Sequence, residues 1–411
     1  MAVTIRTIRE DETRNWLEAV SAGMFEHMDA TKVAEEVRPL WDFNRVWGAF
    51  EAGAVVGTLR TFASELTLPG GGRLPASSVA GVAVRATHRR RGILRQLMAV
   101  EHAAARERGE ALAILHAMEY PIYGRFGYGP ATLSATWTLD AMATEFRGSP
   151  AGSVELATAS PEARDAIKGV FEAWRLRQPG EISRRESTWD YDLGLRESAW
   201  GPRWNGDLAF HRDRAGRLDG YVRYRVEDKW VARQPRYALT VNELHALTDD
   251  AYAALWQYLA SVDLVATIKA ERRAPAERLP WLLTNGRAAE PSEIGDELWV
   301  KLLDVPRALG GRAYERQARI VLEVIDGTGT DAKTRTRVAL DASPAGSTCT
   351  ITDRDADLTL EAAALGAAYL GGARLRDAVV THGFDEHRRD ALATADALFA
   401  TLDAPWCSTF F

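Results

Sequence analysis

The stretch VAGVAVRATHRRRGILRQLM, residues 79–98, joins a strand pattern to a helix pattern through three consecutive arginines and a glycine. VAGVAV is typical of a buried strand. The next apolar run, ALAILHA at 111–117, also has the length of a strand. The order strand, turn, helix, strand predicts a βαβ unit. After Gly92, apolar residues recur at the spacing of a helix with one buried face: Ile93, Leu94, Leu97, Met98, Val100, Ala104 and Ala105.

The arginine-rich turn at 89–92 has two interpretations. The start of a helix exposes about four unpaired N–H groups, so arginines and a close-approach glycine beside it suit a pyrophosphate. The turn matches neither GxxxxGK[ST] nor GxGxxG, and no Ser, Thr, Asp or Asn caps the helix next to the arginines. The alternative is a solvated basic corner. The strand before the turn and the helix after it favour the ligand.

Three segments follow from the pattern of strands and helices. Residues 1–148 alternate strands and helices, and residues 149–303 echo this α/β pattern without the arginines. The helix predicted at 248–262 begins Thr-Asp-Asp, whose side chains would cap the helix themselves and repel a phosphate. Residues 304–411 have an α+β pattern without a catalytic cluster.

Composition excludes several classes of protein. The chain has 411 residues, 46% of them hydrophobic and 26% charged, with a net charge of −6, which argues against a general nucleic-acid binder. Neither a secretory signal nor a membrane-spanning run is apparent, so no membrane partner is expected. The two cysteines, Cys349 and Cys407, stand far apart and form no CxxC, which argues against a disulfide framework or a zinc site and fits a reducing cytoplasm.

At this point the chain resembles a known family. Residues 82–98 are similar to the coenzyme-A-binding segment of the GNAT superfamily of N-acetyltransferases, Gln/Arg-x-x-Gly-x-Gly/Ala, with Leu94 in place of the usual last small residue. THRRRG together with IYGRFGYGPAT at 122–132 resembles the enhanced intracellular survival (Eis) family of actinobacterial acetyltransferases. VNELHALTDDAYAALW, LGAAYLGG and a terminal phenylalanine extend the resemblance over nearly the whole chain.

The resemblance implies tandem GNAT-like domains, the second degenerate, followed by a C-terminal sterol-carrier-protein-like domain. It implies acetyl-CoA as the acetyl donor, no metal, and acceptor amines of aminoglycosides or lysine ε-amines, in a homohexamer. The residues implied to bind the donor are Val82, Ala83, Val84, Arg89, Arg90, Arg91, Gly92, Ile93, Leu94, Arg95 and Glu119. The residues expected around the acceptor are Phe25, Glu26, Asp29, Gly81, Met118, Trp200, Trp204 and Phe410.

Two residues are implied to carry the chemistry. Tyr123 matches the family's general acid, and the α-carboxylate of Phe411 its base, since the terminal aromatic cluster predicts a docked chain end. Tyr128 is the rival acid, and Glu119, acting through water, is the rival base. His116 is interpreted as a core or edge histidine.

The sequence departs from the family pattern around the acceptor. Gly81 stands where an aromatic residue can occur, and Phe410 where a glutamate can occur. Met118 and Glu119 lie within a stretch that differs from the family's small Ser-Glu-Gly-Gly. The pocket is therefore expected to differ in shape and to lose one carboxylate. The alternative function is a lipid- or small-molecule-binding protein that uses the third domain and keeps the first as a scaffold.

Overall fold

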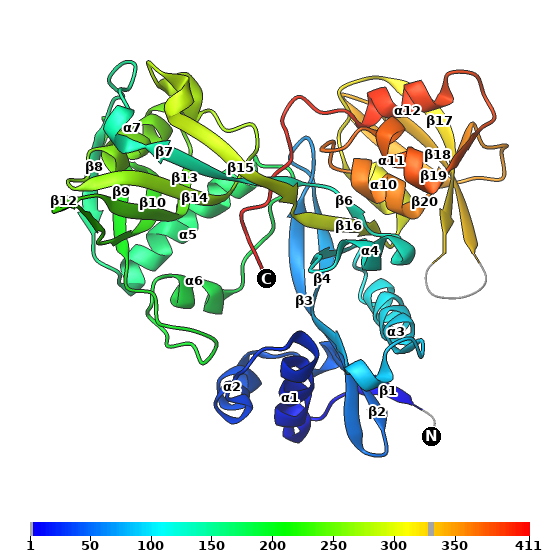
Figure 1. The fold of residues 1–411 in the computed structure, drawn as a ribbon. Coiled ribbons are helices and arrows are strands. Elements are labelled where there is room, and N and C mark those ends of the chain that lie inside the picture. The colour runs from blue at the N-terminus through cyan, green and yellow to red at the C-terminus, as the bar shows by residue number, and fades with distance from the viewer. Residues whose placement is uncertain (1–2, 328–332) are drawn as a thin grey trace.

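The first sheet carries the predicted βαβ unit. The computed structural model describes residues 3–327 and 333–411. β4 and β5 are parallel neighbours, joined by the helix α3 (Ile93–Glu107), as the sequence predicts. The sheet has the order β1-β2-β3-β4-β5-β16-β6 (Figure 1). Its strands are β1 (Thr4–Thr7), β2 (Val46–Glu51), β3 (Ala54–Thr67), β4 (Arg73–Val84), β5 (Leu112–His116), β16 (Leu298–Leu302) and β6 (Gly129–Pro130).

Helices cover both faces of this sheet. Val55 and Val56 are successive residues of β3 and point to opposite faces. Val55 packs with the helices α1 (Thr13–Met24) and α2 (Ala30–Val37), whereas Val56 packs with α3. The stretch 119–130 forms α4 (Tyr120–Tyr123), a 3₁₀ turn and the short β6.

Two strands connect the first sheet to the second. The second sheet has the order β15-β7-β14-β13-β10-β9-β8. β7 (Leu133–Asp140) lies in this second sheet, and β16 returns to the first sheet between β5 and β6. β7 precedes the predicted boundary at 148 but belongs to the second sheet, and β16 precedes the predicted boundary at 303 but belongs to the first. The order of strands along the chain does not determine which sheet a strand joins. The other strands are β8 (Ser153–Ala157), β9 (Asp207–Arg212), β10 (Leu218–Glu227), β13 (Tyr237–Ala246), β14 (Val265–Arg273) and β15 (Ala289–Asp296).

The second sheet repeats the βαβ connection of the first. β13 and β14 are parallel, and α7 (Asp249–Ala260) joins them. The side chain of Thr248 caps α7 by accepting a hydrogen bond from the Ala251 N–H at 3.1 Å, so the predicted helix start is confirmed. α5 (Pro161–Arg175) packs on β10 and β13 of the same sheet, and α6 (Glu186–Asp192) packs on α5.

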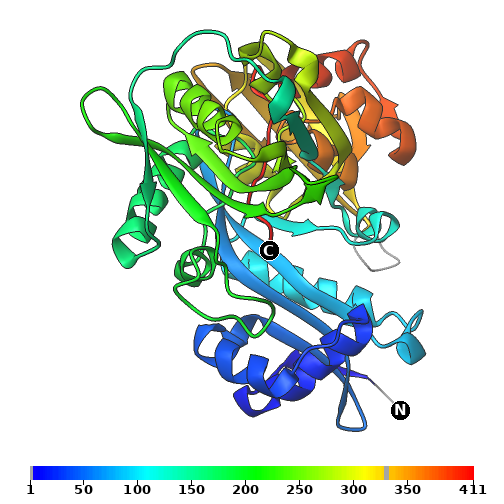
Figure 2. The same cartoon turned by 60° about the vertical axis from the view of Figure 1, so that its left-hand side comes forward.

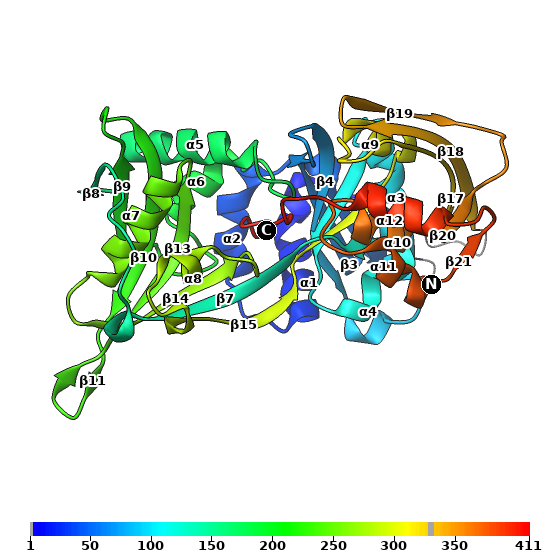
Figure 3. The same ribbon diagram turned by 90° about the horizontal axis from the view of Figure 1, so that it is seen from above.

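The third unit packs on the first sheet. β20 pairs in parallel with β17 in a five-stranded sheet. The apolar side chains of α10 (Ala362–Ala368) share one core with Val300 of β16 and Leu112 of β5. Seen from above, the strands of this sheet lie at the opposite end of the molecule from α7 (Figure 3). Its other elements are α9 (Val305–Gly311), β17 (Ala318–Asp326), β18 (Thr334–Ser343), β19 (Gly346–Ile351), β20 (Leu358–Glu361), α11 (Leu375–His382), β21 (Phe384–Glu386) and α12 (Ala391–Phe399).

A β-bulge bends β4 at Gly81. Thr58 pairs with Ala83 and Arg60 with Ala80, so two residues of β4 oppose one of β3. Gly81 has φ +60°, and a Cβ at this position would lie 2.7 Å from Cη2 of Trp16. Only glycine meets both demands, the left-handed backbone and the close approach of an indole ring.

We expect Gly81→Ala to destabilise the first unit by about 2–4 kcal/mol, because a left-handed non-glycine residue and an overpacked contact each carry a cost. Gly53→Ala is the matched control: its φ is +81°, but nothing lies within 4 Å of the new Cβ. The control should lose only about 1–2 kcal/mol. Urea unfolding followed by tryptophan fluorescence measures both variants, and equal losses would contradict the role of the Trp16 contact.

Candidate active site

β4 and β5 separate beyond the bulge. Their parallel ladder runs only from Ala76 opposite Leu112 to Ser78 opposite Ile114, although β4 continues to Val84 and β5 to His116. Ala83 and Val84 pair with Thr58 and Gly57 of β3, and Val82 lies in the bulge. Within residues 3–327 and 333–411, none of these three residues is in the ladder to β5. This opening lies directly beside the start of α3.

The start of α3 has the backbone geometry of an anion site. Gly92 is left-handed, with φ 76°, and among the described residues no side chain caps the amides of Ile93 and Leu94 that follow it. A Cβ at Gly92 would meet nothing closer than 4.0 Å, so the glycine is required by its conformation rather than by crowding. Arg90 is also left-handed, with φ 63°.

The three arginines of the turn are not equivalent. Arg89 and Arg90 are exposed, and within residues 3–327 and 333–411 their guanidinium groups make no hydrogen bond or ion pair. Arg91 instead binds Glu51, with Nη1 3.2 Å from Oε2, and His88 Nε2 lies 2.9 Å from the same oxygen. The hydrogen bonds from Arg91 and His88 lower the pKa of Glu51 to about 2. Arg91 is thus fixed by a carboxylate on the β2 side.

The two candidate tyrosines, which follow β5 in the chain, have different environments. Tyr128 is fully buried and its hydroxyl lies 2.9 Å from His102 Nε2. Tyr123, at the end of α4, is 8% exposed, and burial followed by the charge of Glu119 raises its pKa to about 12. The Tyr123 hydroxyl therefore keeps its proton at neutral pH. This contrast favours Tyr123 over the rival Tyr128.

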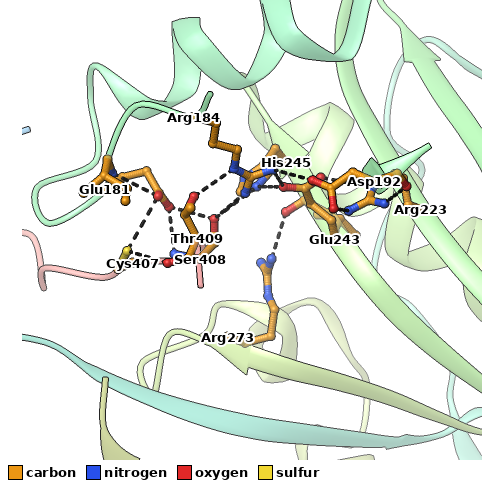
Figure 4. Close-up of polar contacts among 12 residues, drawn as sticks. Glu181, Arg184, Asp192, Arg223, Glu243, His245, Arg273, Cys407, Ser408 and Thr409 are labelled. Carbon is orange, nitrogen blue, oxygen red and sulfur yellow. Dashed lines mark hydrogen bonds and ion pairs between the residues drawn. The ribbon is translucent and has the colours of Figure 1, made fainter. Parts of the chain in front are cut away.

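The C-terminal segment, residues 406–411, lies between the first and second sheets (Figures 1 and 2). The Glu181 carboxylate accepts hydrogen bonds of 2.7 Å from both the N–H and the hydroxyl of Ser408. Trp406 donates from Nε1 to the Arg272 carbonyl at 2.9 Å. Arg184 donates from Nε to Thr409 Oγ1 at 2.8 Å (Figure 4). The predicted docking of the chain end is observed.

The last two residues meet the end of β5. The His116 ring lies 4.6 Å from the Phe411 ring and 4.8 Å from the Phe410 ring. His116 Nε2 also lies 3.2 Å from the Thr409 carbonyl oxygen, and Nδ1 lies 3.1 Å from the Glu297 carbonyl oxygen. Trp406 is buried and Phe411 is partly buried, whereas Phe410 is 55% exposed although it belongs to the terminal aromatic cluster. His116 thus positions the chain end, a role that its local sequence does not reveal.

The residues expected around the acceptor lie in different parts of the structure: some lie on the first unit beside α1 and α2, and others lie on the second unit or on the exposed surface. Phe25 and Glu26 line a shallow hollow beside α1, while the Asp29 carboxylate caps α2 by accepting from the amides of Thr31 and Lys32. In contrast, Trp204 belongs to the second unit, where it packs on Arg223. Met118 and Trp200 are exposed, as is the carboxylate-bearing Glu119 that precedes α4.

A polar cavity of about 280 Å³ lies in the second sheet, where β13 and β14 separate. Glu243 lies at its centre, 2.6 Å from Arg184 and 3.2 Å from Arg223 (Figure 4). Burial opposes ionisation of Glu243, but the two guanidiniums hold its pKa well below the usual range. Residues 406 and 408–410 of the chain end form one wall, so the chain's own terminus occupies this opening.

Two further features bear on ligands. Among the described residues, no group of three or more His, Cys, Asp or Glu side chains is arranged to hold a metal ion. The helices of the described chain are all too short or too polar to cross a membrane.

Family models match three parts of the chain. Two acetyltransferase (GNAT) domain models match residues 4–131 and 180–303, and a sterol carrier protein domain model matches residues 305–408. These matches confirm the predicted fold class of tandem GNAT domains followed by a sterol-carrier-like domain.

Full-length relatives agree with the domain matches. An uncharacterized N-acetyltransferase from Streptomyces griseus is 40% identical over 425 residues and covers all of both chains. The N-acetyltransferase Eis of Mycobacterium tuberculosis is 34% identical over 373 residues, which are 88% of this chain and 87% of that one. The crystal structure of Eis1 from Mycobacterium abscessus aligns over 100% of both chains with a TM-score of 0.84 and 32% identity. The chain belongs to the Eis family of GNAT-type N-acetyltransferases.

Proposed function

We propose that the chain transfers the acetyl group of acetyl-CoA to an amine in the opening between β4 and β5. The observation that carries the proposal is the convergence of three features there: the separated strands, the uncapped start of α3, and the chain end against His116. Acetyl-CoA is the donor of GNAT acetyltransferases as a class. The acceptor and the residue roles are our proposal for this chain.

The donor would be held mainly by backbone groups. The unpaired edge of β4 at Val82 and Val84 offers hydrogen-bond partners to the pantetheine arm, in the manner of an added strand. The amides after Gly92 and the exposed Arg89 and Arg90 would hold the pyrophosphate. Arg91 takes a supporting role, since Glu51 already binds it.

Two groups of the chain would move the protons. The acceptor nitrogen forms a bond to the thioester carbonyl carbon, and the bond from that carbon to sulfur breaks. The Tyr123 hydroxyl gives its proton to the departing thiolate. The Phe411 carboxylate takes the proton released by the amine, with the Phe411 and Phe62 rings, 5.2 Å apart, limiting its hydration.

The acceptor belongs, in this proposal, to the polyamine and lysine ε-amine classes. Glu26 and Phe25 on the first unit supply an anionic and an aromatic contact for a cationic amine. A cytoplasmic homohexamer is part of the same proposal.

Donor binding is tested by thermal and chemical unfolding with CoA. A ligand at 100 times its Kd adds about 2.7 kcal/mol to the free energy of unfolding. We expect the parent protein to show this gain and Arg89→Ala/Arg90→Ala to lose most of it, because two charge-assisted phosphate contacts are removed. Arg389→Ala, which removes an exposed arginine of the third unit, is the control. A parent protein that CoA does not stabilise would support the lipid- or small-molecule-binding alternative.

Replacing Tyr123 with Phe retains the ring and removes the proton donor. We expect kcat to fall by about 10²–10⁴ while the Kd for CoA changes little. Tyr128→Phe is the comparison: loss of its bond to His102 should cost about 1–3 kcal/mol of stability with a much smaller change in kcat. The assay follows thiol release from acetyl-CoA, and an unchanged kcat in Tyr123→Phe would remove this residue from the mechanism.

Adding one alanine after Phe411 displaces the α-carboxylate by about 3.3–3.6 Å. We expect kcat to fall by about 10²–10⁴, the contribution of a general base, with CoA binding retained. Phe411→Leu keeps the carboxylate at the same chain position and should retain far more activity. Parental kcat in the extended chain would instead make Glu119, acting through water, the leading base.

A further inference from the structure

Two arginines that the mechanism does not use surround Phe62. Arg60 of β3 and Arg185, just before α6, have their Cζ atoms 5.7 Å and 4.4 Å from the centroid of the Phe62 ring. Phe62 is also the residue whose ring packs edge-on against Phe411 at 5.2 Å. Arg60 further lies over Trp41, 5.1 Å from its ring. The two guanidiniums therefore lie beside the chain end, next to the ring that contacts Phe411.

Neither guanidinium has an anionic partner. Both side chains are partly buried, and across residues 3–327 and 333–411 neither guanidinium forms an ion pair or donates a hydrogen bond. Burial, with a smaller effect of the Arg185 charge, lowers the pKa of Arg60 to about 9, so both groups are cationic at neutral pH. Adjacent Arg184, by contrast, is paired with Glu243 at 2.6 Å. Two like charges held together out of bulk water are costly unless an anion joins them.

The carboxylates nearby are already engaged. Glu297 binds His116 and Ser134, Glu181 binds Ser408, and Glu36 accepts from the Tyr191 hydroxyl and the Ala199 amide. None of them neutralises Arg60 or Arg185. The α-carboxylate of Phe411, whose ring packs on Phe62, is the remaining anion of the described chain near this pair, and the proposed mechanism uses it for the proton of the amine. A second anion for the two arginines would come from a ligand.

We propose that Arg60 and Arg185 bind an oxyanion, a carboxylate or a phosphate, carried by the acceptor amine itself. Guanidinium groups present planar pairs of donors that match both anions. The inference rests on the proposed function, in which the amine lies at the Phe411 carboxylate. The oxyanion of the same molecule would then lie on the far side of Phe62. It narrows the acceptor to amines that carry an anionic group, such as free lysine, and away from purely cationic polyamines.

Matched pairs of amines test the proposal. L-Lysine and cadaverine differ by a carboxylate, and phosphoethanolamine and ethanolamine by a phosphate. In the parent protein we expect the anionic member of at least one pair to have a kcat/KM about 10- to 100-fold higher. The pair that shows the preference identifies the anion. Arg60→Gln/Arg185→Gln should bring the ratio within each pair close to 1, and Arg60→Lys/Arg185→Lys should restore part of it. Arg319→Gln, an exposed arginine of β17, is the control.

Calorimetry of the same amines separates this proposal from the proposed function. Binding of lysine or phosphoethanolamine that the glutamine variant loses, without any acetyl transfer, would support the anion site and contradict the acetyltransfer proposal. Acetyl transfer without preference for the anionic member of either pair would overturn the anion site and leave the acetyltransfer proposal standing. Absence of binding by both anionic amines at millimolar concentration would also overturn it. The CoA-dependent gain in stability checks that each variant is folded.

Discussion

The exchange of strands between the two large sheets is the constraint on which the site depends. β7 leaves the first unit to lie between β14 and β15, and β16 returns from the second unit to lie between β5 and β6. Moving the two sheets apart would break the backbone hydrogen bonds that β7 and β16 make with their neighbouring strands. The N–H and C=O groups of these strands would then lose their partners. The space between the sheets is therefore fixed by main-chain pairing, and the chain end, Phe62 and Arg185 are placed within it from three different parts of the sequence.

The chain end is held mostly by charge-assisted hydrogen bonds. Glu181 accepts two from Ser408, and Arg184 donates one to Thr409, each of a kind that contributes about 1.5–3 kcal/mol. From Cys407 to Phe410 the burial alternates as in an extended chain: Cys407 and Thr409 are buried, Ser408 is partly buried and Phe410 is exposed. Since Ser408 and Thr409 are held by hydrogen bonds, the position of the Phe411 carboxylate depends on how many residues follow them.

The sequence predicts local features of this molecule better than it predicts their convergence. The βαβ unit, the uncapped start of α3 and the Thr248 cap of α7 depend on residues close in the chain, and all three are observed. Other features depend on residues that are distant in the chain. Arg91 pairs with a residue 40 positions away, and His116 contacts the chain end nearly 300 positions away. The sheets that β7 and β16 join are likewise set by distant strands. Composition and periodicity carry no information about such pairs. Likewise, no sequence motif marks Arg60 and Arg185. Only the folded structure shows that, among the described residues, neither guanidinium pairs with a carboxylate.

The two GNAT units show why one fold gives two different openings. In each, a helix joins two parallel strands that separate beyond their ladder. α3 starts at a left-handed glycine beside the exposed Arg89 and Arg90, so the amides of Ile93 and Leu94 are available to an anion. α7 starts with the hydroxyl of Thr248 on its amides and two aspartates in its first turn, which disfavour an added anion. The chain end forms one wall of the cavity in the second sheet and also contacts His116 of the first. The start of α3 is open to an anion, whereas the start of α7 is already capped, and this difference supports the proposal that the donor binds in the first unit.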